Sequence, residues 1–232
     1  MVLWANGCRS YLEGCFGADP AESSHSITRL EAWVERELAA ELTSAEAKRH
    51  RLGPGTWTKK QTVEDSWDCE AAASLSWAVG LRRRYPSWDK QSTNLGYDCM
   101  DAPAAKDWHS EIALRRKSQI DHQAMSVEAR YWRIRSREPG EPADAYRKKL
   151  MWRAAELGQV KLAPDGDLAL TDGTSVAKLS EFELGALGSI LSERLTGLNW
   201  LCGRDEDWDM VTADTAVTWL WDQAWPESPG RG

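Results

Sequence analysis

Ionisable side chains on apolar helical faces are the residues of this sequence that could do chemistry. Arg194 has leucine or isoleucine at most of the positions three, four and seven residues away, so its guanidinium starts inside the buried face of a predicted helix. A buried arginine stays charged and is unfavourable without a partner. We therefore expect a carboxylate beside Arg194.

Glu70 is the predicted partner. It lies three residues from Trp67 on the apolar face of a second predicted helix. Opposite charges on two buried faces predict an ion pair between Glu70 and Arg194, and Asp209 or Asp214 is the alternative partner for Arg194.

The polar residues around this pair fit either a catalytic carboxylate pair at a pocket or an internal network that ties helices together. We favour the network, because spacing alone does not show that carboxylates converge. The polar set is Glu70, Glu193, Arg194, Asn199, Asp209 and Asp214. The aromatic lining expected for it is Trp67, Trp77, Trp132, Trp200 and Trp208.

Complete motifs for metal, cofactor or nucleophilic chemistry are absent from the sequence. Asp205, Asp207 and Asp209 open like a calcium loop, but Met210 replaces the turn glycine and Ala216 the bidentate glutamate. The histidines show no ligand spacing, and neither a nucleophile elbow nor a glycine-rich phosphate loop occurs. We assign no catalytic residue, no metal and no cofactor, and we lean against an enzyme.

Two capping boxes define the helices that must position the charged residues. The pairs Ser180–Glu183 and Thr58–Gln61 begin helices that run to about residues 203 and 79, carrying Arg194 and Glu70 respectively. Apolar spacings of three and four predict further helices from residue 26 to about 42, 118 to 134 and 146 to 157.

The predicted fold class is mainly α, with one small β insertion. Residues 160–179 alternate apolar and polar side chains around Pro164-Asp165-Gly166 and Asp172-Gly173, which predicts a β-hairpin or meander. We expect a weakly patterned segment at 1–25, a single helical domain at 26–225 and a C-terminal tail at 226–232.

Charge and cysteine content suggest the setting. A net charge of -7 and a pI near 5.2 argue against a nucleic-acid binder and suit a basic protein partner. Five dispersed cysteines do not indicate a disulfide framework or a zinc motif, so a reducing cytoplasm is the expected location. The sequence shows neither an export signal nor an apolar run that would span a membrane.

Three motifs together resemble the bacterial domain-of-unknown-function family 4272. They are SWDCEAAASLSWAVG around Glu70, ERLTGLNWL around Arg194, and WDMVTADT, which carries Trp208, Asp209 and Asp214. The resemblance spans roughly residues 60 to 221. It implies a mostly helical domain and brings no activity, substrate or cofactor.

Two functions are consistent with these observations. The favoured one is a cytoplasmic protein-binding or regulatory module of the immunity or adaptor type, whose acidic surface meets a basic partner. The alternative is an enzyme or small-ligand binder that uses a pocket between the helices carrying Glu70 and Arg194.

Overall fold

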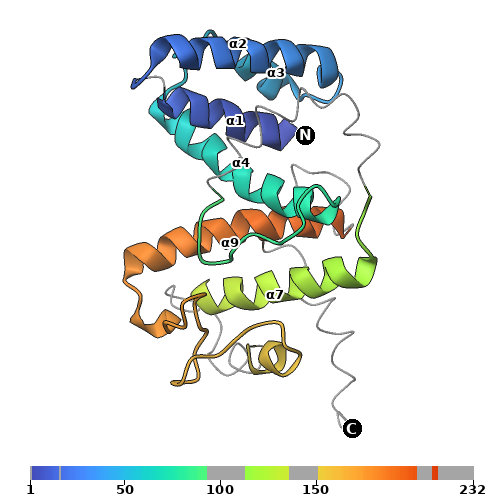
Figure 1. The fold of residues 1–232 in the computed structure, drawn as a ribbon, viewed down its shortest axis with the longest axis vertical. Coiled ribbons are helices and arrows are strands. Elements are labelled where there is room, and N and C mark those ends of the chain that lie inside the picture. The colour runs from blue at the N-terminus through green and yellow to red at the C-terminus, as the bar shows by residue number, and fades with distance from the viewer. Residues whose placement is uncertain (1, 16, 93–112, 136–150, 203–210, 214–232) are drawn as a thin grey trace. The chain divides into compact units, whose positions relative to one another are not determined.

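The computed structural model describes residues 2–15, 17–92, 113–135, 151–202 and 211–213 (Figure 1). The chain divides into two compact units. Unit 1 comprises Met1–Arg83 and Ser92–Ala113, and unit 2 comprises Arg84–Gln91 and Leu114–Gly232. We expected one helical domain at 26–225, and whether the two units fold as one cooperative domain stays a prediction.

Helices dominate both units, which confirms the predicted mainly α class. Unit 1 contains α1 (Val2–Cys15), α2 (Pro20–Glu37), α3 (Ser44–His50) and α4 (Lys59–Ala78). Unit 2 contains α7 (Lys117–Arg135), the short 3-10 helix η2 (Val176–Lys178) and α9 (Glu181–Leu201), and residues 151–156 are also helical.

Side-chain caps fix where these helices begin. The predicted capping boxes at Thr58–Gln61 and Ser180–Glu183 are both present, at the first turns of α4 and α9. A third box, in which Thr43 is the cap, starts α3. At the end of α4, Gly80 has φ +83°, the left-handed conformation that closes a helix without a Cβ clash.

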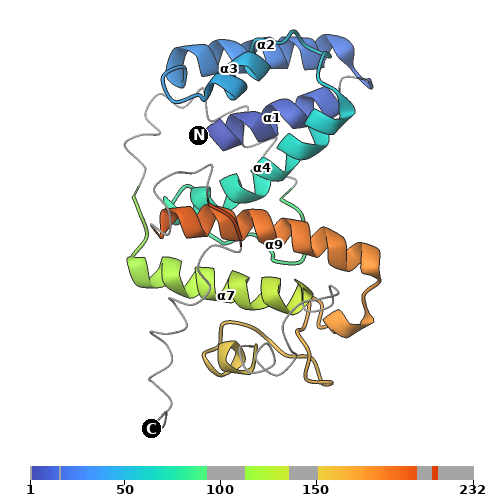
Figure 2. The same ribbon diagram turned by 180° about the vertical axis from the view of Figure 1, so that it is seen from behind.

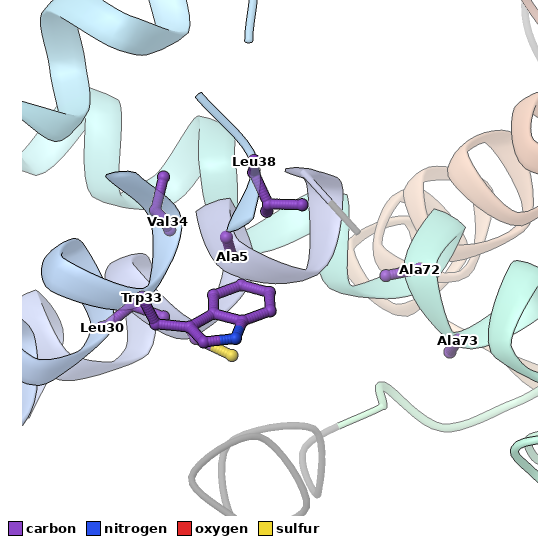
Figure 3. Close-up of a cluster of buried hydrophobic side chains, with 8 residues drawn as sticks. Ala5, Leu30, Trp33, Val34, Leu38, Ala72 and Ala73 are labelled. Carbon is purple, nitrogen blue, oxygen red and sulfur yellow. The ribbon is translucent and has the colours of Figure 1, made fainter. Parts of the chain in front are cut away.

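The core of unit 1 lies where α2 and α4 pack against α1. Figure 3 shows Leu30, Trp33 and Val34 of α2 near Ala5 of α1, with Ala72 and Ala73 on α4. These side chains are at most 4% exposed. Much of the segment at 1–25, which we expected to be weakly patterned, is therefore helical and forms part of the core.

Gly7 explains why the N-terminal helix was not predicted in full. Glycine is usually unfavourable inside a helix, but a Cβ at position 7 would lie 2.3 Å from the Sγ of Cys69 on α4. Gly7 therefore marks a close approach of two helices rather than a chain break. Burial raises the pKa of the Cys69 thiol to about 12, so this sulfur stays neutral within the contact.

In unit 2, α7 and α9 lie side by side in both views (Figure 1, Figure 2). Leu191, Leu195 and Leu198 of α9 are fully buried, as is Val127 of α7. These leucines recur at spacings of three and four, so a single face of α9 supplies the contact. The leucine periodicity of the sequence therefore identified this core correctly.

The strands expected at 160–179 do not form in the described residues. The predicted turns are present, with Gly166 and Gly173 at positive φ, but only two isolated antiparallel bridges flank them, Leu162 with Leu168 and Ala169 with Ser175. The reason is local: the two turns follow closely, Asp165 and Asp172 accept backbone N–H groups inside them, and the hydroxyl of Ser175 caps η2. Too few residues remain between the turns to extend a ladder.

Candidate functional site

A pocket between α2 and α3 is the candidate site of unit 1. Its volume is about 340 Å³. Apolar side chains, two carboxylates, a histidine and an arginine line it: Glu31, Val34, Glu35, Ala39, Leu42, Ala47, His50 and Arg51. The two helices that form it lie next to each other in both ribbon views (Figure 1, Figure 2).

The positions of Glu31 and His50 in their helices determine where the polar groups of this pocket lie. Glu31 lies on α2 next to the buried stripe that contains Ile27, Leu30 and Val34, so its carboxylate is held at the edge of the core. His50 is the last residue of α3, the short helix that begins at the Thr43 capping box.

Arg9 of α1 supports the pocket from the core side. Its Nη1 donates to Oε1 of Glu31 at 2.5 Å, and Nε and Nη2 donate to Oε1 of Glu13 at 2.9 and 2.6 Å. Nη2 also donates to the main-chain oxygens of Leu52 and Gly53, each at 3.0 Å, and the Trp57 ring covers the guanidinium at 5.2 Å. Arg9 is 0% exposed, so these contacts replace its hydration completely.

Both ring nitrogens of His50 face oxygen atoms. Nδ1 lies 3.2 and 3.1 Å from the two carboxylate oxygens of Glu31, and Nε2 lies 2.9 Å from Oδ1 of Asn6. The amide nitrogen of Asn6 donates to Asp68 at 2.9 Å, which fixes the amide orientation and turns its oxygen towards His50. Neither nitrogen of His50 therefore presents a free lone pair to the pocket.

An ion pair between half-buried Arg49 and buried Asp65 joins α3 to α4. Arg49 Nη1 donates to Oδ1 of Asp65 at 2.5 Å, while the Asp65 Oδ2 atom is buried and accepts no hydrogen bond within the described part of the chain. Burial raises the pKa of Asp65, and the neighbouring Arg49 charge opposes that effect only in part.

The two residues predicted to be buried charges are both fully buried. Glu70 accepts from the main-chain N–H of Ser92 at 2.6 Å and from its hydroxyl at 3.0 Å. Arg194 donates to the main-chain oxygens of Ser87 at 2.7 Å and Lys90 at 2.8 Å. Glu70 belongs to unit 1 and Arg194 to unit 2, and their pairing stays a prediction.

The other predicted site residues have varied environments. Asn199 is buried and donates to the main-chain oxygen of Thr212 at 3.0 Å, and Glu193 is half-buried. Among the tryptophans, Trp77 is buried, Trp67 and Trp132 are half-buried, and Trp200 is 39% exposed. Asp209, Asp214 and Trp208 lie outside the described residues.

Sequence reasoning missed the Arg9, Glu31 and His50 network. One signal was present: Glu31 lies four residues after Ile27 and three before Val34, the same arrangement on an apolar face that singled out Glu70. Arg9 gave no comparable signal because it lies in the segment 1–25, which we expected to be weakly patterned. The contact of His50 with Asn6 joins residues 44 apart in sequence, which spacing does not reveal.

Cys8 differs from the other cysteines whose bonding state is described. It is 3% exposed and disulfide-bonded, whereas Cys69 and Cys202 are free. A single disulfide is not a disulfide framework, and the expected cytoplasmic location stays a prediction.

Comparison of the chain with protein-family models, curated proteins and solved structures finds no match. The resemblance to family 4272 therefore stays a prediction from its three motifs. Within the described ranges, neither a metal-binding group of three or more His, Cys, Asp or Glu residues nor a helix apolar and long enough to cross a membrane is present.

Proposed function

We propose that this protein is a binding module rather than an enzyme, and that the α2–α3 pocket receives a side chain of a protein partner. The main support for the proposal is that the polar groups of His50 and Glu31 already contact other side chains of the protein. His50 is held by Glu31 and Asn6, while Glu31 accepts from Arg9. A general acid or base must reach a substrate proton, and these groups are occupied by the protein itself.

The pocket suits an apolar side chain with a basic neighbour. Val34, Leu42 and Ala47 supply apolar surface, and Glu35 at the exposed edge makes no ion pair within the described ranges. A partner lysine or arginine could lay its methylene groups on Leu42 and bring its charge to Glu35. The volume falls at the small end of ligand pockets, which fits a side chain better than a large cofactor.

Charge distribution refines the expected acidic surface. Acidic and basic residues are equal in number when all described residues are taken together. The acidic excess of the sequence therefore belongs to the remaining segments. Asp205, Glu206, Asp207 and Asp209 are examples. The proposed preference for a basic partner therefore relies on Glu35 at the pocket and on these acidic segments. An adaptor or immunity-type role remains part of the proposal.

The alternative function, an enzyme with a pocket between the Glu70 and Arg194 helices, has less support. The Glu70 carboxylate accepts two hydrogen bonds from Ser92, and Arg194 donates to two main-chain oxygens. Side chains used in this way stabilise loops and do not present reactive groups to a substrate.

Site-specific photocrosslinking tests the binding proposal. p-Benzoylphenylalanine replaces Ala39, which lines the pocket, or Ala21, an exposed alanine at the other end of α2, and mass spectrometry identifies the captured segments. We expect a protein segment with lysine or arginine beside an apolar residue, captured at position 39 and not at 21, with a lower yield in Glu35→Lys. Equal capture at both positions would contradict the proposal.

A further inference from the structure

We propose that Arg130 of α7 forms, with Trp88, an anion-binding site in unit 2 that takes a phosphate or carboxylate group. This site lies outside the α2–α3 pocket and does not depend on the proposed function. The proposal starts from the contacts that orient the guanidinium of Arg130.

Neutral acceptors hold one edge of this guanidinium. Nη1 donates to the main-chain oxygen of Ser126 at 3.0 Å and to its hydroxyl, and Nη2 donates to the main-chain oxygen of Gln159 at 3.1 Å. The Ser126 hydroxyl itself donates to that Gln159 oxygen at 2.7 Å, so these contacts converge on one side of Arg130. Within the described part of the chain, the hydrogen bonds of this arginine therefore go to neutral oxygens.

Two donors of Arg130 remain unused within the described residues. A guanidinium has five N–H groups, and the contacts above leave Nε–H and one Nη2–H. These two N–H groups are parallel neighbours, the pair that a carboxylate or phosphate accepts in bidentate fashion.

Trp88 adds a face to the site. The Arg130 Cζ lies over the Trp88 ring at 5.3 Å from its centroid, so the guanidinium is stacked and its edge is held in a fixed direction. Both residues are half-buried and so keep some contact with solvent.

Among the described residues, Asp89 acts on Arg130 through its charge but does not hydrogen-bond to it. Asp89 accepts instead from the Ser87 hydroxyl at 2.6 Å and from the N–H and hydroxyl of Thr171, each at 2.7 Å. Burial lowers the pKa of Arg130 to about 10, and the neighbouring Arg194 charge adds to this effect while Tyr85 and Asp89 oppose it. The group still carries its charge at neutral pH, and a bound anion would offset the cost of burying it.

Arginine side-chain NMR on the full chain tests this site. Inorganic phosphate and acetate are titrated separately at constant ionic strength, with chloride as the control anion, and Arg130→Lys assigns the Nε–H signal. We expect a saturable shift of the Arg130 signal with phosphate or acetate and none with chloride, and the stronger of the two identifies the preferred group. Absence of a saturable shift in the wild-type protein would overturn the proposal.

Calorimetric titration with the same two anions provides the matched comparison. Arg130→Gln should weaken binding by about tenfold or more, the effect of losing a charge-assisted bidentate contact. Arg153→Gln, which changes a surface arginine that pairs with Glu156, should bind as the wild type does. Equal loss in both variants would show non-specific charge attraction and contradict the site. Circular dichroism confirms that each variant is folded.

Discussion

Asn6 on α1 holds the end of α3, because its side-chain oxygen lies 2.9 Å from Nε2 of His50. On its other side the same amide donates to Asp68 of α4. One small side chain thus ties three helices, and it also fixes which groups of His50 are available to the pocket. Packing and polar contacts of unit 1 are therefore coupled at the proposed binding site.

Glu31 should matter for stability far more than its neighbour Glu35. Glu31→Gln weakens the contacts to Arg9 and His50, so we expect the free energy of unfolding to fall by about 1–3 kcal/mol. Glu35→Gln removes an exposed carboxylate one turn away and should change it by less than about 0.5 kcal/mol. Urea unfolding measures both, and similar losses would argue against the network.

Gly7 should tolerate no side chain. Gly7→Ala places a Cβ against Cys69, and we expect a loss of about 1–3 kcal/mol from overpacking. Gly185→Ala on α9 meets no atom within 4 Å and should instead gain about 0.5–1 kcal/mol from helix propensity. Thermal unfolding compares the two, and adding Cys69→Ala to Gly7→Ala should recover part of the loss.

Asp65 should make the stability of unit 1 decrease as pH rises. Its pKa is raised in the folded state, because burial outweighs the attraction of Arg49. The folded protein therefore binds the Asp65 proton more tightly than the unfolded chain. This contribution is present below the unfolded pKa and is lost as pH rises through the folded value.

Asp65→Asn isolates this effect. The amide oxygen still accepts from Arg49 but carries no charge to desolvate, so we expect equal or higher stability at pH 7 and a flatter dependence on pH between 4 and 7. Urea unfolding at several pH values measures it. A clear loss of stability at neutral pH would mean that the Arg49 attraction exceeds the burial cost.

Arg194 should be costly to remove. Arg194→Met leaves the carbonyl groups of Ser87 and Lys90 without these donors, and we expect a loss of about 2–4 kcal/mol. A double-mutant cycle with Glu70→Gln tests the predicted ion pair. A coupling energy of about 1 kcal/mol or more supports it, and additive losses within about 0.5 kcal/mol contradict it.

Single-helix features were the predictable part of this fold. The leucine stripe and the Ser180 capping box located α9, and the apolar neighbours of Arg194 correctly indicated a buried charge. Turn residues located the reversals near Gly166 and Gly173, but turn chemistry alone does not decide whether a ladder extends beyond one bridge.

Contacts between helices could not be predicted from the spacing of residues in the sequence. The sequence does not show whether Gly7 interrupts a helix or allows a neighbouring helix to pack closely against it. The partners that define the pocket, Arg9 with Glu31 and His50 with Asn6, are brought together by packing of three helices. Local periodicity carries no information about such long-range choices.

The path of the backbone has a practical consequence. Residues 84–91 belong to unit 2, yet Ser92–Ala113 return to unit 1 before the chain continues at Leu114. Neither unit is a continuous stretch, so a cleavage after Ala113 would leave residues 84–91 of unit 2 attached to unit 1. A fragment ending at residue 83 would lack Ser92, which donates two hydrogen bonds to the fully buried Glu70. Such a fragment would therefore leave that carboxylate without these two donors.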